Sequence, residues 1–419
     1  MPKPRTIPSL NAVKSFADIE QFMPPTLDVV GAEGPREYEF FRDCGEIPFE
    51  SNATTYSPVN AWYMSELAFL AYVEKPTTAE VEAAVAPALA RVFRGAVEVK
   101  VLLGAARRWG KPDQHDQIQC IVAHDGRTGV IAFRGTLPKS VPNWLTDADF
   151  VLVPEPGPKG MWVHKGFRGA LDSVWLSGQD GGLDQYLAEM DRRHPGIRWW
   201  FTGHSLGAAL ATLAARRYGK AHALYSFGSP KVGNAAFATQ VEKTVHLLHR
   251  VVNHRDIVTR LPNLPLFAHV GSLMHVEEST SATVAWLARI WDWLRRLLGL
   301  KSRWEAIVDK WFDNASRLKS GIEARSLMRA CLDHTPICYS KILWNCLAAK
   351  YDEPLSGETV TEPNGRVPTT PWCLEIRLCR HALRVVSIGV GYAAQLALAN
   401  VTGTLMLPAG AGCAIPAAA

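Results

Sequence analysis

Three residue types that together can activate a hydroxyl group occur along this chain in a fixed order. Ser205 lies in the pentapeptide Gly-His-Ser-Leu-Gly, Asp256 lies in "HRVVNHRDIVTRLP", and several histidines follow. A serine hydroxyl is a poor nucleophile unless a base takes its proton and an acid orients that base. The order serine, acid, histidine is one of the chain orders in which such catalytic triads occur. The pattern favours acyl transfer at Ser205. The alternatives are a tight turn with an incidental serine, and an Asp256 that only forms a salt bridge.

Sequence spacing alone does not decide which histidine would act as the base. His269, in "LFAHVGS", and His275 follow Asp256 closely. His334, in "CLDHTPICYSKIL", lies between two helical segments, where a loop would present its imidazole.

The residues around Ser205 predict the tight turn that a nucleophilic serine needs. The apolar strand "IRWWFT" ends at Thr202, and a helix of small residues begins directly after the pentapeptide. Gly203 and Gly207 avoid side-chain clashes across such a turn. The serine then lies at a helix N-terminus, where free N–H groups and the helix dipole favour negative charge.

Strands and helices alternate on both sides of this turn. The stretch 118–135 reads as two strands joined by a D-G-R-T-G turn, with further strands at 197–202, 222–227 and 245–253. Helices are expected at 61–74, 77–93, 168–193, 206–217 and 233–241. This alternation predicts the α/β class with a mainly parallel central sheet.

Several segments together resemble the ordered motif series of the class 3 lipases, which are α/β-hydrolases that cleave carboxylic esters of lipids. The resemblance covers roughly residues 60–350. The segments are "VIAFRGT" (130–136), "NWLTDADF" (143–150), "VHKGF" (163–167), "FTGHSLGAALATLAA" (201–215), "YSFGSPKVGN" (225–234) and "RVVNHRDIVTRLP" (250–262).

The resemblance implies a role for each matching position. Ser205 would be the nucleophile, Asp256 the acid, and His334 the base, because "LDHTPICY" resembles the family's later D-H segment. Thr136 and the backbone N–H of Leu206 would form the oxyanion hole. The interval from Asp256 to His334 is long for a compact member of the family, so His269 remains the alternative base.

The resemblance also implies a lid over the serine. Between Thr136 and His164, Val141, Trp144 and Leu145 fall on one apolar stripe of a short helix. An ordinary packed surface helix would show the same stripe.

Residues 279–330 form a Trp- and Arg-rich helical insert. Amphipathic basic helices over 284–318 are typical of peripheral contact with an anionic membrane. A helical cap docked on the hydrolase core is the alternative.

The domain organisation follows from these segments. We expect an irregular lead-in at 1–55, a hydrolase domain at 56–350 that contains the insert, and a linker with an apolar C-terminal extension at 351–419. The uncharged stretch 385–407 is long enough for a membrane-spanning helix, but its polar residues and glycines favour a packed or poorly ordered tail.

The composition argues against a nucleic-acid-binding protein. The chain has 419 residues, 47% of them hydrophobic, and a net charge of +5. This charge is modest and forms no dense basic stripe, so no nucleic-acid partner is expected.

No cofactor motif is visible in the sequence. The eight cysteines form no C-x-x-C pair and no D-x-D-x-D-G loop occurs, so neither a metal nor an organic cofactor is expected. The first residues lack an apolar signal-peptide core, which predicts a cytoplasmic or membrane-associated protein unless it is exported by a signal-independent route.

The sequence therefore predicts a serine hydrolase for lipid esters, a triacylglycerol lipase or esterase that forms an acyl-enzyme on Ser205. One alternative is a phospholipase or lysophospholipase at a membrane surface. The other is a membrane-associated scaffold with a hydrolase fold and no turnover. The oligomeric state is not predicted.

Overall fold

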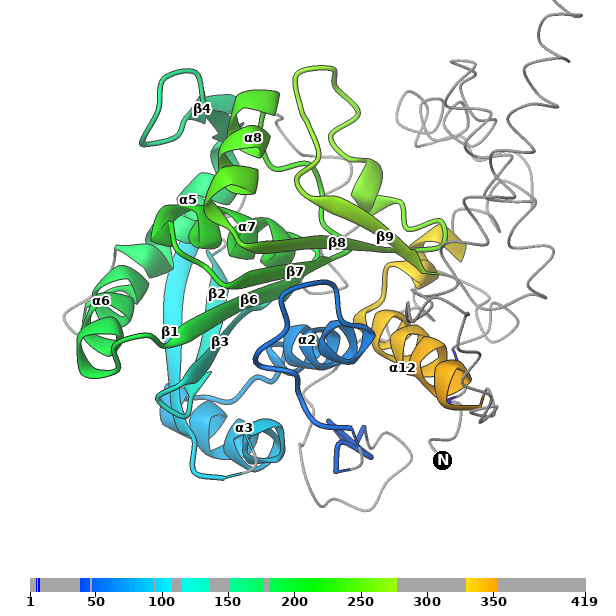
Figure 1. Cartoon of the computed structure of the whole chain (residues 1–419). Coiled ribbons are helices and arrows are strands. Elements are labelled where there is room, and N and C mark those ends of the chain that lie inside the picture. Colours follow the sequence, from blue (N-terminus) through cyan, green and yellow to red (C-terminus); the bar gives the residue numbers. More distant parts are fainter. Residues whose placement is uncertain are drawn as a thin grey trace, which may run out of the picture. The chain divides into compact units, whose positions relative to one another are not determined.

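The central feature of the computed structural model is a seven-stranded sheet in the order β1-β2-β3-β6-β7-β8-β9 (Figure 1). The structure describes residues 5, 7, 38–45, 47–93, 95–107, 115–135, 151–176, 181–276 and 329–352. The strands are β1 (Glu98–Arg107), β2 (His115–His124), β3 (Thr128–Phe133), β6 (Arg198–His204), β7 (Ala223–Phe227), β8 (Leu247–Asn253) and β9 (Ser272–Val276). A separate hairpin joins β4 (Leu152–Pro154) and β5 (Trp162–His164).

The strand directions confirm the predicted fold class. β3, β6, β7, β8 and β9 run parallel, while β1 and β2 extend the sheet as antiparallel strands. The hairpin expected from the D-G-R-T-G turn is the β2–β3 pair. Because side chains alternate across a strand, parallel strands covered on both faces are apolar throughout. β6 shows this, with Trp199 and Phe201 in one core cluster and Trp200 in the other.

Helices cover both faces of the sheet (Figure 1). One face packs against α5 (Lys165–Trp175), α6 (Leu183–Arg193), α7 (Leu206–Tyr218) and α8 (Ala235–Thr244). The other packs against α2 (Pro58–Leu70), α3 (Thr78–Phe93) and α12 (Pro336–Asp352). α7 lies close to the sheet because six of its nine buried residues are alanine or glycine. This close packing fixes the serine turn at its N-terminus.

The single helix expected over 168–193 is wrong, because the structure has two helices there, α5 and α6. The intervening sequence contains three glycines, which favour neither helix nor strand. Gly181 has φ +78°, a left-handed conformation that a helix cannot continue, and Gly182 caps α6.

Several sequence predictions lie outside the described residues. These are the oxyanion residue Thr136, the lid residues Val141, Trp144 and Leu145, the insert up to residue 328, and the C-terminal extension from residue 353. Contacts divide the chain into Met1–Glu353 and Pro354–Ala419, and every described residue lies in the first unit. Among the described helices, none combines the length and apolar character needed to cross a membrane.

Candidate active site

Ser205 lies in a strained turn between β6 and α7. Its φ of 58° and ψ of −126° are rare for a residue with a side chain, and such conformations cost on the order of 1–3 kcal/mol. The backbone holds this geometry, because Ser205 N–H donates to Phe227 O at 2.9 Å and Ala208 N–H donates to Ser205 O at 3.0 Å. The turn thus places a serine at the C-terminal edge of a parallel sheet, as the sequence predicted.

The two glycines of the pentapeptide leave no room for a side chain. A Cβ added to Gly203 would lie 2.3 Å from the Gly207 carbonyl carbon, and one added to Gly207 would lie 2.1 Å from Phe133 O. Both contacts are with backbone, which cannot move aside. The glycines therefore allow α7 to begin directly beneath the ends of β3 and β6.

Asp256 and His334 form a buried hydrogen-bonded pair. His334 Nδ1 lies 2.9 Å from both Oδ1 and Oδ2 of Asp256, although 78 residues separate them in sequence. Their exposed fractions are 1% for Asp256 and 2% for His334. Asp256 follows β8, and His334 lies in the turn just before α12. The fold thus brings the acid and the base candidate into contact.

This pairing fixes the tautomer of a neutral His334. The Asp256 carboxylate can only accept, so Nδ1 carries the proton and Nε2 has its lone pair free. Nε2 is buried and has no hydrogen-bond partner within the described part of the chain. An unprotonated and unpartnered Nε2 is what a general base requires.

Gly228 connects the serine turn to this pair. Ser205 N–H bonds to Phe227 O, and a Cβ on the next residue, Gly228, would lie 2.8 Å from Asp256 Oδ2 and 2.9 Å from His334 Nδ1. Ser205 and the imidazole of His334 therefore lie beside two consecutive residues, Phe227 and Gly228. Gly228 has φ +58°, so its conformation also disfavours any side chain.

Tyr339 is a site residue that the sequence reasoning missed. Its hydroxyl, on α12, donates to Asp256 Oδ2 at 2.5 Å, while Val258 N–H donates to Asp256 Oδ1 at 2.9 Å. Burial, followed by the negative charge of Asp256, raises the pKa of Tyr339 well above its usual value. The hydroxyl is therefore a donor at any working pH. The spacing H-x-x-x-x-Y places it one helical turn into α12, but only the fold reveals its partner.

His204, the residue before Ser205, supports the loop that carries His334. Its Nε2 lies 2.5 Å from His334 O and its Nδ1 lies 2.9 Å from the hydroxyl of Tyr72. Burial, followed by the charge of His334, lowers the pKa of His204 well below its usual value, so the ring is neutral. A carbonyl oxygen can only accept, so Nε2 donates to it and Nδ1 accepts from Tyr72.

His269, the alternative base, lies in a different environment. Burial, followed by the charges of Arg250 and Lys231, lowers its pKa to about 3. Its Nδ1 has no hydrogen-bond partner among the described residues. The carboxylate of Asp256 contacts His334 instead, so the structure brings one of the two candidate histidines to the acid.

One of the two expected oxyanion groups can be located. Leu206 is the first residue of α7, where backbone N–H groups have no partner within the helix. No acidic side chain lies in that first turn, and the Ser205 side chain does not cap it. Such an end attracts a developing negative charge. Among the described residues, no group of three or more metal-ligating side chains occurs.

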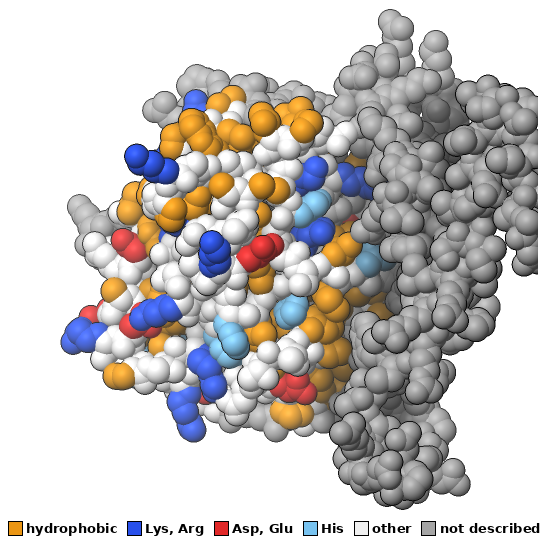
Figure 2. Space-filling model, turned by 45° about the horizontal axis from the view of Figure 1, so that its top comes forward, with side chains coloured by type: hydrophobic (Ala, Val, Ile, Leu, Met, Phe, Trp, Pro, Cys, Tyr) orange, Lys and Arg blue, Asp and Glu red, His pale blue; other side chains and the backbone are white. Residues whose placement is uncertain are grey.

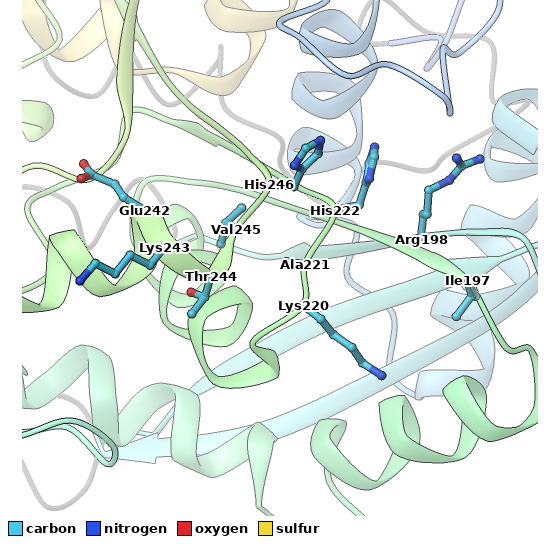
Figure 3. Close-up of a pocket in the computed structure, with 10 residues that line it drawn as sticks. All are labelled: Ile197, Arg198, Lys220, Ala221, His222, Glu242, Lys243, Thr244, Val245 and His246. Atoms are coloured by element: carbon cyan, nitrogen blue, oxygen red, sulfur yellow. The ribbon is translucent and has the colours of Figure 1, made fainter.

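A surface pocket of about 500 Å³ lies at the opposite ends of the strands (Figure 3). It is lined where β6, β7 and β8 begin, whereas Ser205 and Asp256 follow strand ends. Two of its basic side chains have other partners, since Lys220 Nζ lies 2.8 Å from Asp191 Oδ2 and His222 Nε2 lies 3.1 Å from Ala53 O. Figure 3 shows Lys220 and Lys243 pointing away from each other. This pocket is separate from the candidate active site.

The fold and the serine turn define an α/β-hydrolase, and sequence comparison matches part of the chain to a known family. Residues 130–266 match the family Lipase (class 3). This match confirms the predicted resemblance to the class 3 lipases.

The chain is similar to several characterised members of the family. It is 36% identical to the lipase of Rhizomucor miehei over 167 residues, which are 38% of this chain and 44% of that protein. It is 35% identical to the secreted mono- and diacylglycerol lipase A of Penicillium cyclopium over 169 residues, 39% and 53% of the two chains. It is 32% identical to phospholipase A1-II 6 of Oryza sativa subsp. japonica over 187 residues, 36% and 44% of the two chains.

The chain thus spans about half the length of the curated relatives it matches. Among solved structures, that of the Rhizomucor miehei triacylglyceride lipase is 32% identical with a TM-score of 0.34. The match covers 42% of this chain and 66% of that chain.

Proposed function

We propose that this chain is a carboxylic ester hydrolase for lipids, with Ser205 as nucleophile, His334 as base and Asp256 as the acid that orients it. The observation that carries the proposal is the Asp256–His334 pair, which leaves a buried, unpartnered Nε2. Asp256 and His334 meet beside Gly228, next to the strained serine turn. A fold kept only for binding would gain nothing from this arrangement.

Each residue then has a defined step. His334 Nε2 takes the proton of Ser205 Oγ as the oxygen attacks the ester carbonyl, and Asp256 stabilises the imidazolium that forms. The Leu206 N–H, with Thr136 from the segment outside the described residues, receives the oxyanion; such a donor is typically worth about 3–4 kcal/mol in the transition state. His334 returns the proton to the leaving alcohol. Water then attacks the acyl-enzyme with His334 as base again.

The lipid character of the substrate rests on the relatives and on exposed apolar side chains. Two of the relatives are named as a lipase and a mono- and diacylglycerol lipase. Leu266, 68% exposed, and Trp162 lie on neighbouring segments, because Ala268 and Val163 both form bridges with Gly233. Figure 2 shows hydrophobic side chains gathered along the upper edge of one face. Such side chains suit contact with a lipid surface.

A phospholipid is the second candidate substrate. The specific observation is the 32% identity to a rice phospholipase A1. The proposed membrane contact through 284–318 and the lid at Val141, Trp144 and Leu145 lie outside the described residues and stay predictions. The cytoplasmic or membrane-associated location stays a prediction as well, and two fungal relatives are named as secreted.

The test is hydrolysis of ester series by wild type, Ser205→Ala, His334→Ala and His269→Ala. Substrates are p-nitrophenyl esters of rising chain length, emulsified triacylglycerol, and phosphatidylcholine vesicles. We expect the Ser205 and His334 variants to lose at least about 10³-fold in kcat, and His269→Ala to keep most activity. An inactive His269→Ala beside an active His334→Ala would overturn the base assignment. Failure of the wild type on every ester, and with a fluorophosphonate probe, would favour the scaffold alternative.

A further inference from the structure

A second Asp–His pair lies directly beside the first. Asp333, the residue before His334, has a buried carboxylate. His254, two residues before Asp256, places its Nδ1 at 2.9 Å from Asp333 Oδ2. The two pairs are reciprocal, because each chain segment supplies one aspartate and one histidine.

The carboxylate of Asp333 is fully engaged. Besides His254, it accepts from Arg329 Nε at 2.7 Å and from Arg255 N–H at 3.2 Å. Its backbone carbonyl accepts from Asn253 Nδ2 at 2.8 Å. Asp333 therefore joins the segment that carries the base to the three residues that precede Asp256. A buried carboxylate needs such donors, since one without them is strongly destabilising.

His254 has a backbone conformation that is uncommon for a residue with a side chain. Its φ is +39°, a region in which histidine, asparagine and aspartate occur more often than other such residues. Its N–H donates to Val276 O at 2.8 Å, and its carbonyl oxygen accepts from His275 Nε2 at 2.9 Å. His254 thus touches the end of β9 through its backbone and Asp333 through its side chain.

These contacts link two segments that are far apart in sequence. Asp256 and His334 are separated by 78 residues, yet the His254–Asp333 contact joins the residues beside them. Val276 O accepts from the backbone of His254, and Arg329 donates to Asp333. The position of His334 is thereby tied to the strand end that leads into Asp256.

We infer that Asp333 and His254 are positioning residues that set the imidazole of His334 against Asp256 and Ser205. The inference rests on the proposed function, because it assigns His334 as the base. Neither residue is assigned a contact with Ser205 Oγ, His334 Nε2 or the ester. Their effect is exerted through the placement of His334, and a displacement of about 1 Å at a catalytic group can cost on the order of 100-fold in rate.

The experiment compares Asp333→Asn, His254→Gly and the double variant in the full chain. Asp333→Asn removes the charge at constant shape. His254→Gly keeps a residue that accepts positive φ and has no side chain to contact Asp333. We expect each single variant to lower kcat about 10- to 100-fold with KM within about twofold, and to slow fluorophosphonate labelling of Ser205 by the same factor. The double variant should fall no further than the poorer single one, because residues that act as a unit are not additive.

Asp191→Asn is the matched control. Asp191 also accepts from three side chains, those of Trp199, Tyr218 and Lys220, but it lies near the end of α6, away from Ser205. The Asp191→Asn variant should have a lower melting temperature and an unchanged kcat. A Tm loss in Asp333→Asn with wild-type kcat would overturn the inference, as would additive losses in the double variant.

A second readout keeps the inference separate from the proposed function. The proton between His334 Nδ1 and Asp256 gives a far-downfield NMR resonance that reports their geometry without any substrate. We expect it to move or broaden in His254→Gly and to stay unchanged in Asp191→Asn. A wild type without labelling or hydrolysis would defeat the proposed function. An active wild type whose resonance and kcat are unaltered in His254→Gly would defeat the positioning role alone.

Discussion

Asp256 receives three hydrogen bonds, from His334, from the backbone of Val258 and from the hydroxyl of Tyr339. Because a carboxylate has two oxygens with several lone pairs, the extra donors fix its plane and with it the direction of the His334 ring. The residue types of the proposed triad could be named from the sequence. Tyr339 and His204 could not, because their roles depend on contacts with residues more than 80 positions away.

Tyr339→Phe tests this third donor. The change removes one hydrogen bond to a charged group, a contribution of about 1.5–3 kcal/mol. We expect kcat to fall by about 10-fold or more, with little change in KM, because the substrate does not contact Tyr339 in this account. Steady-state kinetics on a soluble ester measures both constants.

Tyr63→Phe serves as its control. Tyr63 is also a buried tyrosine, and its hydroxyl donates to Ile47 O at 2.7 Å, away from Asp256. This variant should lose stability and keep kcat. A Tyr339→Phe enzyme that behaves like Tyr63→Phe would contradict an orienting role for Tyr339.

At the scale of elements, the turns that end the parallel strands build the site. β6 leads into the serine turn, β7 ends just before Gly228, and β8 leads into Asp256. Apolar runs and breaking residues mark the parallel strands β3, β6, β7 and β8 and the helices after β6 and β7, so the sequence predicted them. It missed β1 and the fifth parallel strand, β9. β9 has exposed or half-buried residues at every position except Val276, so no buried alternation marks it as a strand.

Gly228→Ala tests whether the turn after β7 must be empty. The added methyl group would lie within 3.0 Å of Asp256 Oδ2 and of the His334 ring. These groups can give way only by separating, so we expect a loss of activity of at least about 100-fold together with lower stability. Kinetics and thermal unfolding measure the two effects.

Gly219→Ala separates the steric effect from backbone strain. Gly219 ends α7 with φ +78°, but an added Cβ there would meet its nearest atom only at 3.9 Å. We expect it to lose about 1 kcal/mol of unfolding free energy and to retain full activity. Equal activity in both alanine variants would show that the turn after β7 does not need to be empty.

At the scale of the whole molecule, the burial of neutral histidines governs acid stability. Burial lowers the pKa of His204 well below its usual value and that of His269 to about 3. It also lowers the pKa values of His124, His222 and His249. In the unfolded chain such histidines bind protons below about pH 6.5. The two states therefore bind different numbers of protons in mild acid.

The lowered histidine pKa values determine how the free energy of unfolding changes with pH. Above about pH 6.5 neither state holds these protons, and the stability contribution is complete. As the pH falls, the unfolded state binds protons that the folded state cannot, so the free energy of unfolding decreases. The slope is at most about 1.4 kcal/mol per pH unit for each such histidine, and for His269 it extends down to about pH 3.

His269→Gln isolates one histidine. It removes a group that titrates in the unfolded state alone over this range, so the variant should lose less stability than wild type on acidification. Between pH 8 and pH 5 the difference in unfolding free energy between the two proteins should change by about 2 kcal/mol in favour of the variant. Urea unfolding at the two pH values measures it, and pH 8 serves as the internal reference. The same difference at both values would mean that His269 takes up its proton in the folded protein as readily as in the unfolded chain, and the acid sensitivity would then have to come from the other buried histidines.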